Sequence, residues 1–248
     1  NRPEPPEDLR PQFPLIRDAT RAFSLPCIEM QGYEADDLIA SYTVAAQAQG
    51  WDVTIVSSDK DLMQLVTLNQ SDDAPHVDML DTMKNVRMGP EAVAEKFGVG
   101  PELVGDVLAL MGDSVDNVPG VRGVGPKTAT KLIQEYGSLE AALAGAETMK
   151  PSKLRDNLIE HADMARLSRQ LVELCRDCPL PQPLDELKLD GIPKEPLRDF
   201  LLLHGFKSMA ARIGGDAPTP APGADRSAAM SGGILGEAWQ PKAGASTA

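Results

Sequence analysis

Seven carboxylate side chains in this sequence stand in three short groups, and each group falls at the end of a predicted helix or strand. They are Glu34, Asp36 and Asp37, then Asp59 and Asp61, and finally Asp113 and Asp116. Crowded carboxylates repel one another unless a cation or solvent separates them. Hard divalent cations such as Mg²⁺ take oxygen ligands and keep several waters, so they use few carboxylates directly. A surplus of acids of this kind is what a site for two such ions would need.

Each group taken alone also has an ordinary structural explanation. Apolar side chains recur every three or four positions after Glu34, which predicts a helix over residues 34–49, and the helix dipole stabilises acids in its first turn. The pair at 59 and 61 follows Val53–Val56, a β-branched run typical of a buried parallel strand, and such pairs also cap turns. Ligands of open α/β sheets bind at the carboxyl ends of strands. The first group alone supports capping and metal binding equally, whereas three groups at element ends favour metal binding.

A basic, glycine-rich stretch follows the third acidic group. Gly123 and Gly125 permit a tight turn and close approach of the backbone, and Pro126 opens a helix that carries lysines. Free N–H groups at a helix start bind anions, although a plain helix-turn-helix corner would look similar. The whole stretch favours binding to a nucleic-acid backbone, and its candidate residues are Arg122, Gly123, Val124, Gly125, Lys127, Thr128 and Lys131.

Composition limits the function classes. The chain has 248 residues, 42% of them hydrophobic, and a net charge of −13, which suits one or two domains with a sizeable core. The negative charge argues against broad attraction to phosphate backbones, so nucleic-acid contact requires a local basic patch or metal ions. With no apolar run of eighteen residues and no basic-then-apolar leader, we expect neither a membrane span nor secretion. The odd cysteine count fits a reducing cytosol, and the single Cys-x-x-Cys pair does not complete a zinc site.

Further elements follow from periodicity and turn residues. Helices are predicted over residues 13–23, 90–97 and 101–111, with two or three more over 137–177 and a last pair over 196–213. Strands are predicted over residues 25–30, 76–80 and 86–88, with a helical turn over 60–66. From Gly214 onward small residues and proline dominate, which predicts a flexible tail or an interdomain linker.

Four motifs together resemble the 5′-nuclease (flap endonuclease) family. They are Gly32-Tyr-Glu-Ala-Asp-Asp-Leu38, Ser58-Asp-Lys-Asp-Leu62, Gly112-Asp-Ser-Val-Asp-Asn117 and Pro119-Gly-Val-Arg-Gly-Val-Gly-Pro-Lys-Thr-Ala129. Their order and spacing are most similar to the 5′→3′ exonuclease domain of bacterial DNA polymerase I, over about residues 1–214.

The resemblance implies an α/β fold in which residues 1–88 form a partial PIN-like nuclease domain, with a mostly parallel sheet, flanking helices and the first strand missing. Residues 89–213 would form a helical region with a helix-hairpin-helix (helix-3-turn-helix) element at about 101–136, and residues 214–248 the tail or linker. The implied activity is metal-dependent cleavage of 5′ DNA ends and flaps, nicked or gapped duplexes and RNA primer ends in replication and repair. The implied setting is the bacterial cytosol, as a monomer with polymerase domains linked beyond the tail.

The same resemblance assigns roles to the candidate residues. The first of two Mg²⁺ or Mn²⁺ ions would be held by Glu34, Asp36, Asp37, Asp59 and Asp61, and the more distant ion by Asp113 and Asp116. The turn at 123–125 would offer backbone N–H groups to the uncleaved strand and hold a potassium ion, and Arg2 would approach the scissile phosphate. The family's first strand and two further metal-binding aspartates would precede Asn1. We therefore expect a metal site short of ligands, an exposed sheet edge and little activity from this chain alone.

Two other functions stay open at this point. A noncatalytic duplex-DNA binding module would use the basic hairpin, with the acids serving structural roles. A PIN-type ribonuclease would share the acidic sheet edge but would not need the hairpin.

Overall fold

The fold was obtained as a computed structural model, which describes residues 4–67 and 74–214. Internal contacts divide the chain into a larger unit, residues 1–21 and 25–190, and a smaller unit, residues 22–24 and 191–248. Among the described residues, no helix has both the length and the apolar character required to cross a membrane.

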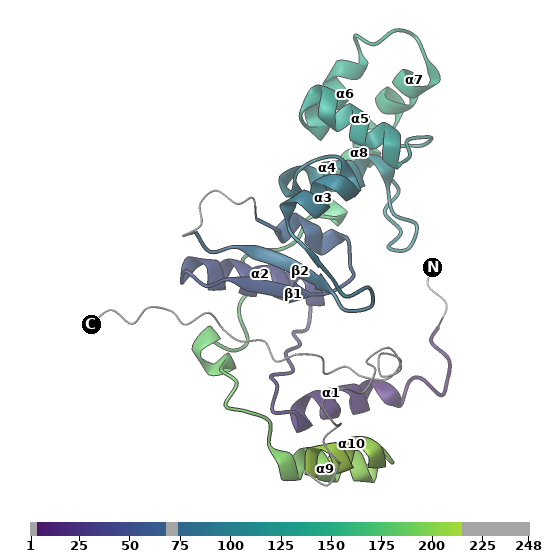
Figure 1. The fold of residues 1–248 in the computed structure, drawn as a ribbon. Coiled ribbons are helices and arrows are strands. Elements are labelled where there is room, and N and C mark those ends of the chain that lie inside the picture. The colour runs from purple at the N-terminus through teal and green to yellow at the C-terminus, as the bar shows by residue number, and fades with distance from the viewer. Residues whose placement is uncertain (1–3, 68–73, 215–248) are drawn as a thin grey trace, which may run out of the picture. The chain divides into compact units, whose positions relative to one another are not determined.

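A small mixed sheet forms part of the larger unit (Figure 1). Its strands, in spatial order, are β1 (Val53–Val56), β2 (Val77–Asp81) and β3 (Val86–Met88). β1 pairs in parallel with β2, beginning with Val53 opposite Val77, and β2 pairs antiparallel with β3. β2 is buried on both faces, as expected for the central strand of a covered sheet. β1 lies at the edge of the described sheet, and its residue Val56 is 62% exposed.

Helix α2 (Ala35–Ala48) packs beside β1 and the 3-10 turn η1 (Asp61–Leu65). Glu34 is its N-cap residue, and the chain leaves the helix at Gly50, whose φ of 76° lies in the left-handed region that glycine tolerates. The helix buries Leu38, Ala40 and Ala46, so its apolar face fixes the direction in which its acidic first turn points.

From residue 90 onward the larger unit is mainly helical. Its elements are α3 (Pro90–Phe97), the 3-10 turn η2 (Pro101–Leu103), α4 (Val104–Met111), α5 (Pro126–Tyr136), α6 (Leu139–Ala146), α7 (Lys153–Glu160), α8 (Ala162–Leu171) and the 3-10 turn η3 (Leu184–Leu187). α4 is apolar around most of its circumference and is enclosed by α5, α6 and α8. A helix that is apolar all round needs neighbours on every side, so α4 is the central element of this region.

The smaller unit is built on a pair of helices, α9 (Lys194–Leu203) and α10 (Lys207–Gly214). Leu197, Leu201 and Ala210 are buried between them. Ala22 and Phe23, which belong to this unit, pack against the cluster. Helix α1 (Gln12–Ala22), of which residues 12–21 belong to the larger unit, buries no residue.

The predicted fold class, a PIN-like α/β region followed by a helical region, is confirmed, and the described sheet is mixed. The helix predicted over 101–111 divides into η2 and α4. The strand predicted over residues 25–30 is wrong: the segment forms no ladder, because no described strand lies beside it to complete its backbone hydrogen bonds. The predicted tail lies outside the described residues from position 215 onward.

Candidate metal centre and nucleic-acid interface

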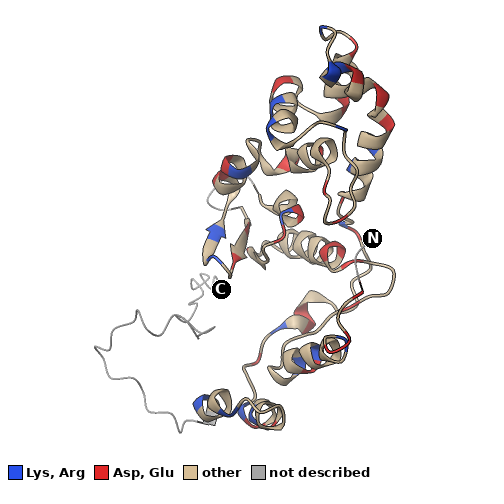
Figure 2. Cartoon of the chain, turned by 90° about the vertical axis from the view of Figure 1, so that its right-hand side faces the viewer, with Lys and Arg blue, Asp and Glu red and all other residues tan. Residues whose placement is uncertain are grey.

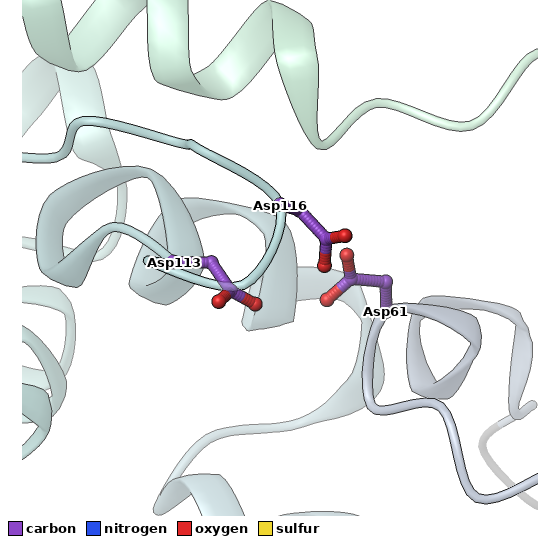
Figure 3. A group of neighbouring side chains, drawn as sticks. All are labelled: Asp61, Asp113 and Asp116. Carbon is purple, nitrogen blue, oxygen red and sulfur yellow. The ribbon is translucent and has the colours of Figure 1, made fainter. Parts of the chain in front are cut away.

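Acids from two separate segments meet in the larger unit (Figure 3). Asp61 begins η1, the next element after β1 in the chain, whereas Asp113 and Asp116 lie in the loop that follows α4. Carboxylate oxygens of these three residues all lie within 4.8 Å of one another. The sequence prediction grouped Asp61 with the acids of α2, and the structure places it next to the third group as well.

The loop after α4 is held by two glycines whose backbones touch. Gly112 and Gly120 both take positive φ, 71° and 63°, and a Cβ built on Gly120 would lie 2.5 Å from the Gly112 nitrogen. Asp113 and Val118 exchange backbone hydrogen bonds of 2.8 and 2.7 Å across the loop. Only glycine allows such an approach, so these two residues determine where Asp113 and Asp116 project.

Asp113 is buried, and both of its carboxylate oxygens accept hydrogen bonds. Its side chain is 7% exposed; Oδ2 accepts a hydrogen bond from Lys60 Nζ, and Oδ1 accepts one from the Val115 N–H at 2.8 Å. Burial alone would raise the pKa of Asp113, but these hydrogen bonds and the Lys60 charge hold it below its ordinary value. Lys60 Nζ also lies 3.6 Å from Asp61 Oδ1, so one ammonium group connects the two acidic segments.

The acids at the start of α2 have different surroundings. Asp37 Oδ2 accepts the Glu34 N–H at 3.1 Å, as in a capping box, and Asp37 Oδ1 accepts the Cys175 N–H at 2.9 Å. Asp36 is half-buried, and burial followed by the charges of Asp59 and Asp61 raises its pKa to about 6. Asp37 therefore has a structural role at the helix start, while Asp36 lies in the electrostatic field of the second acidic group.

The acidic cluster has the donor set of a hard divalent cation. Asp61 Oδ1 is buried and has no hydrogen-bond partner within the described chain. Burial and the charges of neighbouring acids raise the pKa of Asp61, although the Lys60 charge acts in the opposite direction. A cation among these oxygens would reduce the repulsion and coordinate Asp61 Oδ1, which has an ion pair with Lys60 at 3.6 Å but no hydrogen bond. The residues that would hold it are Asp61, Asp113 and Asp116, with Asp36 and Asp59 nearby.

The basic hairpin begins in the same loop and is anchored to α4 through the hydrogen bond from the Val121 N–H to the Leu110 carbonyl, 2.8 Å. The Val124 N–H donates to the Val121 carbonyl at 3.0 Å, and the Val124 side chain is buried. The prediction that Val124 offers its N–H to a ligand is therefore corrected, because the turn itself uses this donor. The N–H groups of the exposed Gly123 and Gly125 have no acceptor in the described residues.

Cationic side chains flank this turn in an otherwise mixed charge pattern. Arg122, Lys127 and Lys131 are exposed around the start of α5, and Thr128 is partly buried. Figure 2 shows basic and acidic residues distributed over helices of the described chain. The cationic side chains and the glycine N–H groups at this turn therefore form the candidate surface for binding a nucleic-acid backbone.

Sequence reasoning missed Asn157, on α7. Its Nδ2 donates to the Arg122 carbonyl at 2.7 Å and lies 3.2 Å from the position that a Cβ on Gly123 would occupy. Asn157 thus fixes the turn from a different helix. A single asparagine inside an amphipathic helix carries no signal for such a contact. Arg2, the predicted phosphate contact, lies outside the described residues.

Two family models match consecutive parts of this chain. A model described as the 5′-3′ exonuclease N-terminal resolvase-like domain matches residues 1–98. A model described as the 5′-3′ exonuclease C-terminal SAM fold matches residues 99–195. The boundary between them falls just after α3, and together they include every predicted site residue.

Similar curated proteins are DNA polymerases I. The chain is 52% identical to DNA polymerase I of Rhizobium leguminosarum over 213 residues, which are 86% of this chain and 20% of that protein. It is 38% identical to DNA polymerase I of Bacillus caldotenax over 216 residues, again 86% of this chain and 24% of that protein. The chain thus spans about a fifth to a quarter of the length of these relatives.

Similar solved structures support the fold. A T5 5′-exonuclease structure with bound zinc ions has a TM-score of 0.59 and 21% identity, covering 86% of this chain and 71% of that one. The catalytic core of Rad2 in complex with a DNA substrate has a TM-score of 0.55 and 15% identity, covering 87% and 72%. With consecutive models matching residues 1–195, the chain belongs to the 5′-3′ exonuclease family.

Proposed function

We propose that this chain provides the 5′→3′ exonuclease and structure-specific 5′-flap endonuclease activity of a DNA polymerase I-like protein. The observation that carries the proposal is the meeting of Asp61, Asp113 and Asp116 within 4.8 Å, although they come from segments far apart in the sequence. The loop that supplies Asp113 and Asp116 continues directly into the basic hairpin. The hairpin is adjacent in sequence to two acids of the cluster. A duplex bound by the hairpin would therefore lie near the acidic cluster.

Each group of residues has a distinct part in this proposal. The acidic cluster holds divalent cations, for which we propose Mg²⁺ or Mn²⁺. Such cations, when bound, lower the pKa of the attacking water and stabilise charge on the phosphodiester. Asp37 keeps the start of α2 in place, which holds Asp36 near Asp59 and Asp61. Gly123 and Gly125 donate N–H groups to the uncleaved strand, and we propose that Arg2 approaches the scissile phosphate and that K⁺ binds at the hairpin.

The wider setting belongs to the same proposal, because the chain spans only 20–25% of the relatives' length. DNA polymerase I relatives suggest polymerase domains in the same polypeptide and a role in replication and repair. We propose 5′ flaps, nicked or gapped duplexes and RNA primer ends as substrates, a monomeric state and the bacterial cytosol.

The test is cleavage of a 5′-labelled flap duplex, with Mg²⁺ or with EDTA, by this chain and by a longer polypeptide that matches the relatives' length. We expect the longer polypeptide to release short 5′ products in a Mg²⁺-dependent reaction. Intact DNA in every reaction, with the duplex still bound in a gel-shift assay, would reject the nuclease proposal.

One observation favours a second candidate, a noncatalytic duplex-binding module. Asp113 of the cluster is paired with Lys60, and Asp37 at the start of α2 accepts two backbone N–H groups, so both acids have partners within the protein itself. In that case the duplex would bind equally well with Mg²⁺ or EDTA and would never be cut. The same flap assay therefore distinguishes the two candidates.

A further inference from the structure

The ammonium group of Lys60 lies within the acidic cluster and already makes contacts that a bound cation would make. It donates a hydrogen bond to Asp113 Oδ2 and lies 3.6 Å from Asp61 Oδ1. These two carboxylates come from different segments, one after β1 and one after α4. Lys60 therefore joins the two sides of the cluster with a single positive charge.

Burial strengthens the electrostatic attraction in this contact. The exposed fractions of the Asp113, Asp61 and Lys60 side chains are 7%, 16% and 27%. Solvent and salt screen charges at this depth much less than they screen surface charges. Removal of one partner from a buried ion pair leaves the other charge uncompensated, which is strongly unfavourable.

A divalent cation bound by Asp61 and Asp113 would need the same space. Asp113 Oδ1 accepts the Val115 N–H, so Oδ2, which faces Lys60, is the oxygen more readily turned toward an ion. An ammonium group and a divalent cation beside one carboxylate oxygen repel each other strongly. The two positive groups therefore compete for Asp113 Oδ2.

We propose that Lys60 is an internal counter-ion of the metal centre: it links the Asp61 and Asp113 segments in the metal-free protein and is displaced from Asp113 when a divalent cation binds. This inference rests on the proposed function, because it takes Asp61, Asp113 and Asp116 as ligands of the cation. Lys60 is then a positioning residue with two opposite effects. It stabilises the metal-free fold and weakens cation binding.

The experiment compares the 248-residue chain with its Lys60→Met, Lys60→Arg and Lys84→Met variants. Lys84 is the matched control, because it pairs with Asp81 at 3.6 Å but lies outside the acidic cluster. Thermal unfolding is measured in EDTA, and Mn²⁺ binding without DNA is measured from the electron paramagnetic resonance signal of the free ion.

We expect Lys60→Met to lower the metal-free midpoint by about 5 °C, the scale for loss of a partly buried charge partner. We expect the same variant to bind Mn²⁺ about tenfold more tightly, because a competing positive charge is gone. Lys60→Arg should retain a Mn²⁺ affinity close to that of the wild type, and Lys84→Met should leave the Mn²⁺ affinity unchanged because Lys84 lies outside the acidic cluster.

A Lys60→Met protein that is folded by circular dichroism but binds Mn²⁺ no more tightly than the wild type would overturn the inference. Absence of Mn²⁺ binding by both proteins would overturn it as well. If Lys60→Met does not fold, Lys60→Gln, which removes the charge and keeps a hydrogen-bond donor, is subject to the same criterion. Failure of the proposed function appears separately, as intact flap DNA, because the Mn²⁺ measurement contains no nucleic acid.

Discussion

The start of α2 and the loop after α4 carry the same residue types, yet their carboxylates behave in opposite ways. In the loop, Asp113 is buried beside Lys60, and the pKa of Asp113 is lowered. At the helix start, Asp36 is half-buried near other acids, and the pKa of Asp36 is raised to about 6. Burial acts in the same direction at both positions, so the partner decides the outcome. An acidic motif therefore shows where charge is concentrated, but its surroundings decide how that charge is stabilised.

The largest effect is expected from the acids of the loop. In the longer polypeptide, the double change Asp113→Asn and Asp116→Asn should reduce flap cleavage at least about 100-fold, because neutral amides bind hard cations poorly. Duplex affinity in a gel-shift assay with EDTA should stay close to that of the wild type. Asp185→Asn, at an exposed acid in η3, is the control and should leave both measurements unchanged. Undiminished cleavage by the double variant would remove these acids from the mechanism.

A second prediction concerns the rigidity of that loop. Gly120→Ala should lower the free energy of unfolding by about 3 kcal/mol, because its Cβ would meet the Gly112 backbone at 2.5 Å and its φ is positive. Gly137→Ala is the matched control: Gly137 has a positive φ of 84° but nothing within 4 Å of its Cβ position. It should cost only about 1 kcal/mol. Urea unfolding measures both, and equal losses would contradict a loop held by close backbone contact.

The capping acid of α2 provides a third prediction. Asp37→Ala should destabilise the protein by about 2 kcal/mol, because the Glu34 and Cys175 N–H groups lose their acceptor. The loss should be the same with EDTA or with Mn²⁺ if the role of Asp37 is structural. A loss that appears only with Mn²⁺ would instead identify Asp37 as a ligand.

Replacement of Asp36 should have the opposite effect on stability to replacement of Asp37. Its folded-state pKa lies above the ordinary value of 3.8, so the folded protein binds this proton more tightly than the unfolded chain does. The associated stability is present at low pH and is lost as the pH rises from about 4 through about 6. The full shift corresponds to about 3 kcal/mol, and solvent screening of this half-exposed group reduces it to about 1 kcal/mol.

Asp36→Asn should therefore raise the stability of the metal-free protein at pH 7 by about 1 kcal/mol and flatten its decrease between pH 4 and 6. Urea unfolding in EDTA across this pH range measures the difference. A variant that is less stable than the wild type at pH 7 would show that Asp36 has a stabilising partner instead of repelling neighbours.

The smallest effect is expected at the hairpin. Asn157→Ala should weaken duplex binding about fivefold, because the turn loses its hydrogen bond to the Arg122 carbonyl. Gln134→Ala is the matched control, since its amide donates to the Gly98 carbonyl at 2.6 Å, away from the turn. Fluorescence anisotropy with labelled duplex compares the two. An equal loss in both variants would indicate a general change in α5 and α7 instead of a contact specific to the turn.

Much of the fold was predictable because its determinants are local. The spacing of apolar residues located α2, and the proline at position 90 located the start of α3, since helix periodicity and first-turn proline preferences act over a few residues. The strand wrongly predicted over residues 25–30 marks the limit of this reasoning. A strand exists only when a second strand accepts its backbone hydrogen bonds, and local sequence does not record that neighbour.

The residue types of the candidate site were likewise predictable only where they depend on local sequence. The sequence by itself determined which acids stand at element ends and where a glycine turn opens a helix, because both properties depend on adjacent residues. Only the tertiary structure decided that Lys60 contacts Asp113, 53 positions away, that Asp37 serves the backbone while Asp36 lies among other acids, and that Asn157 supports the turn. Charge pairing and hydrogen bonding depend on distances in space, which are established only when the chain is folded.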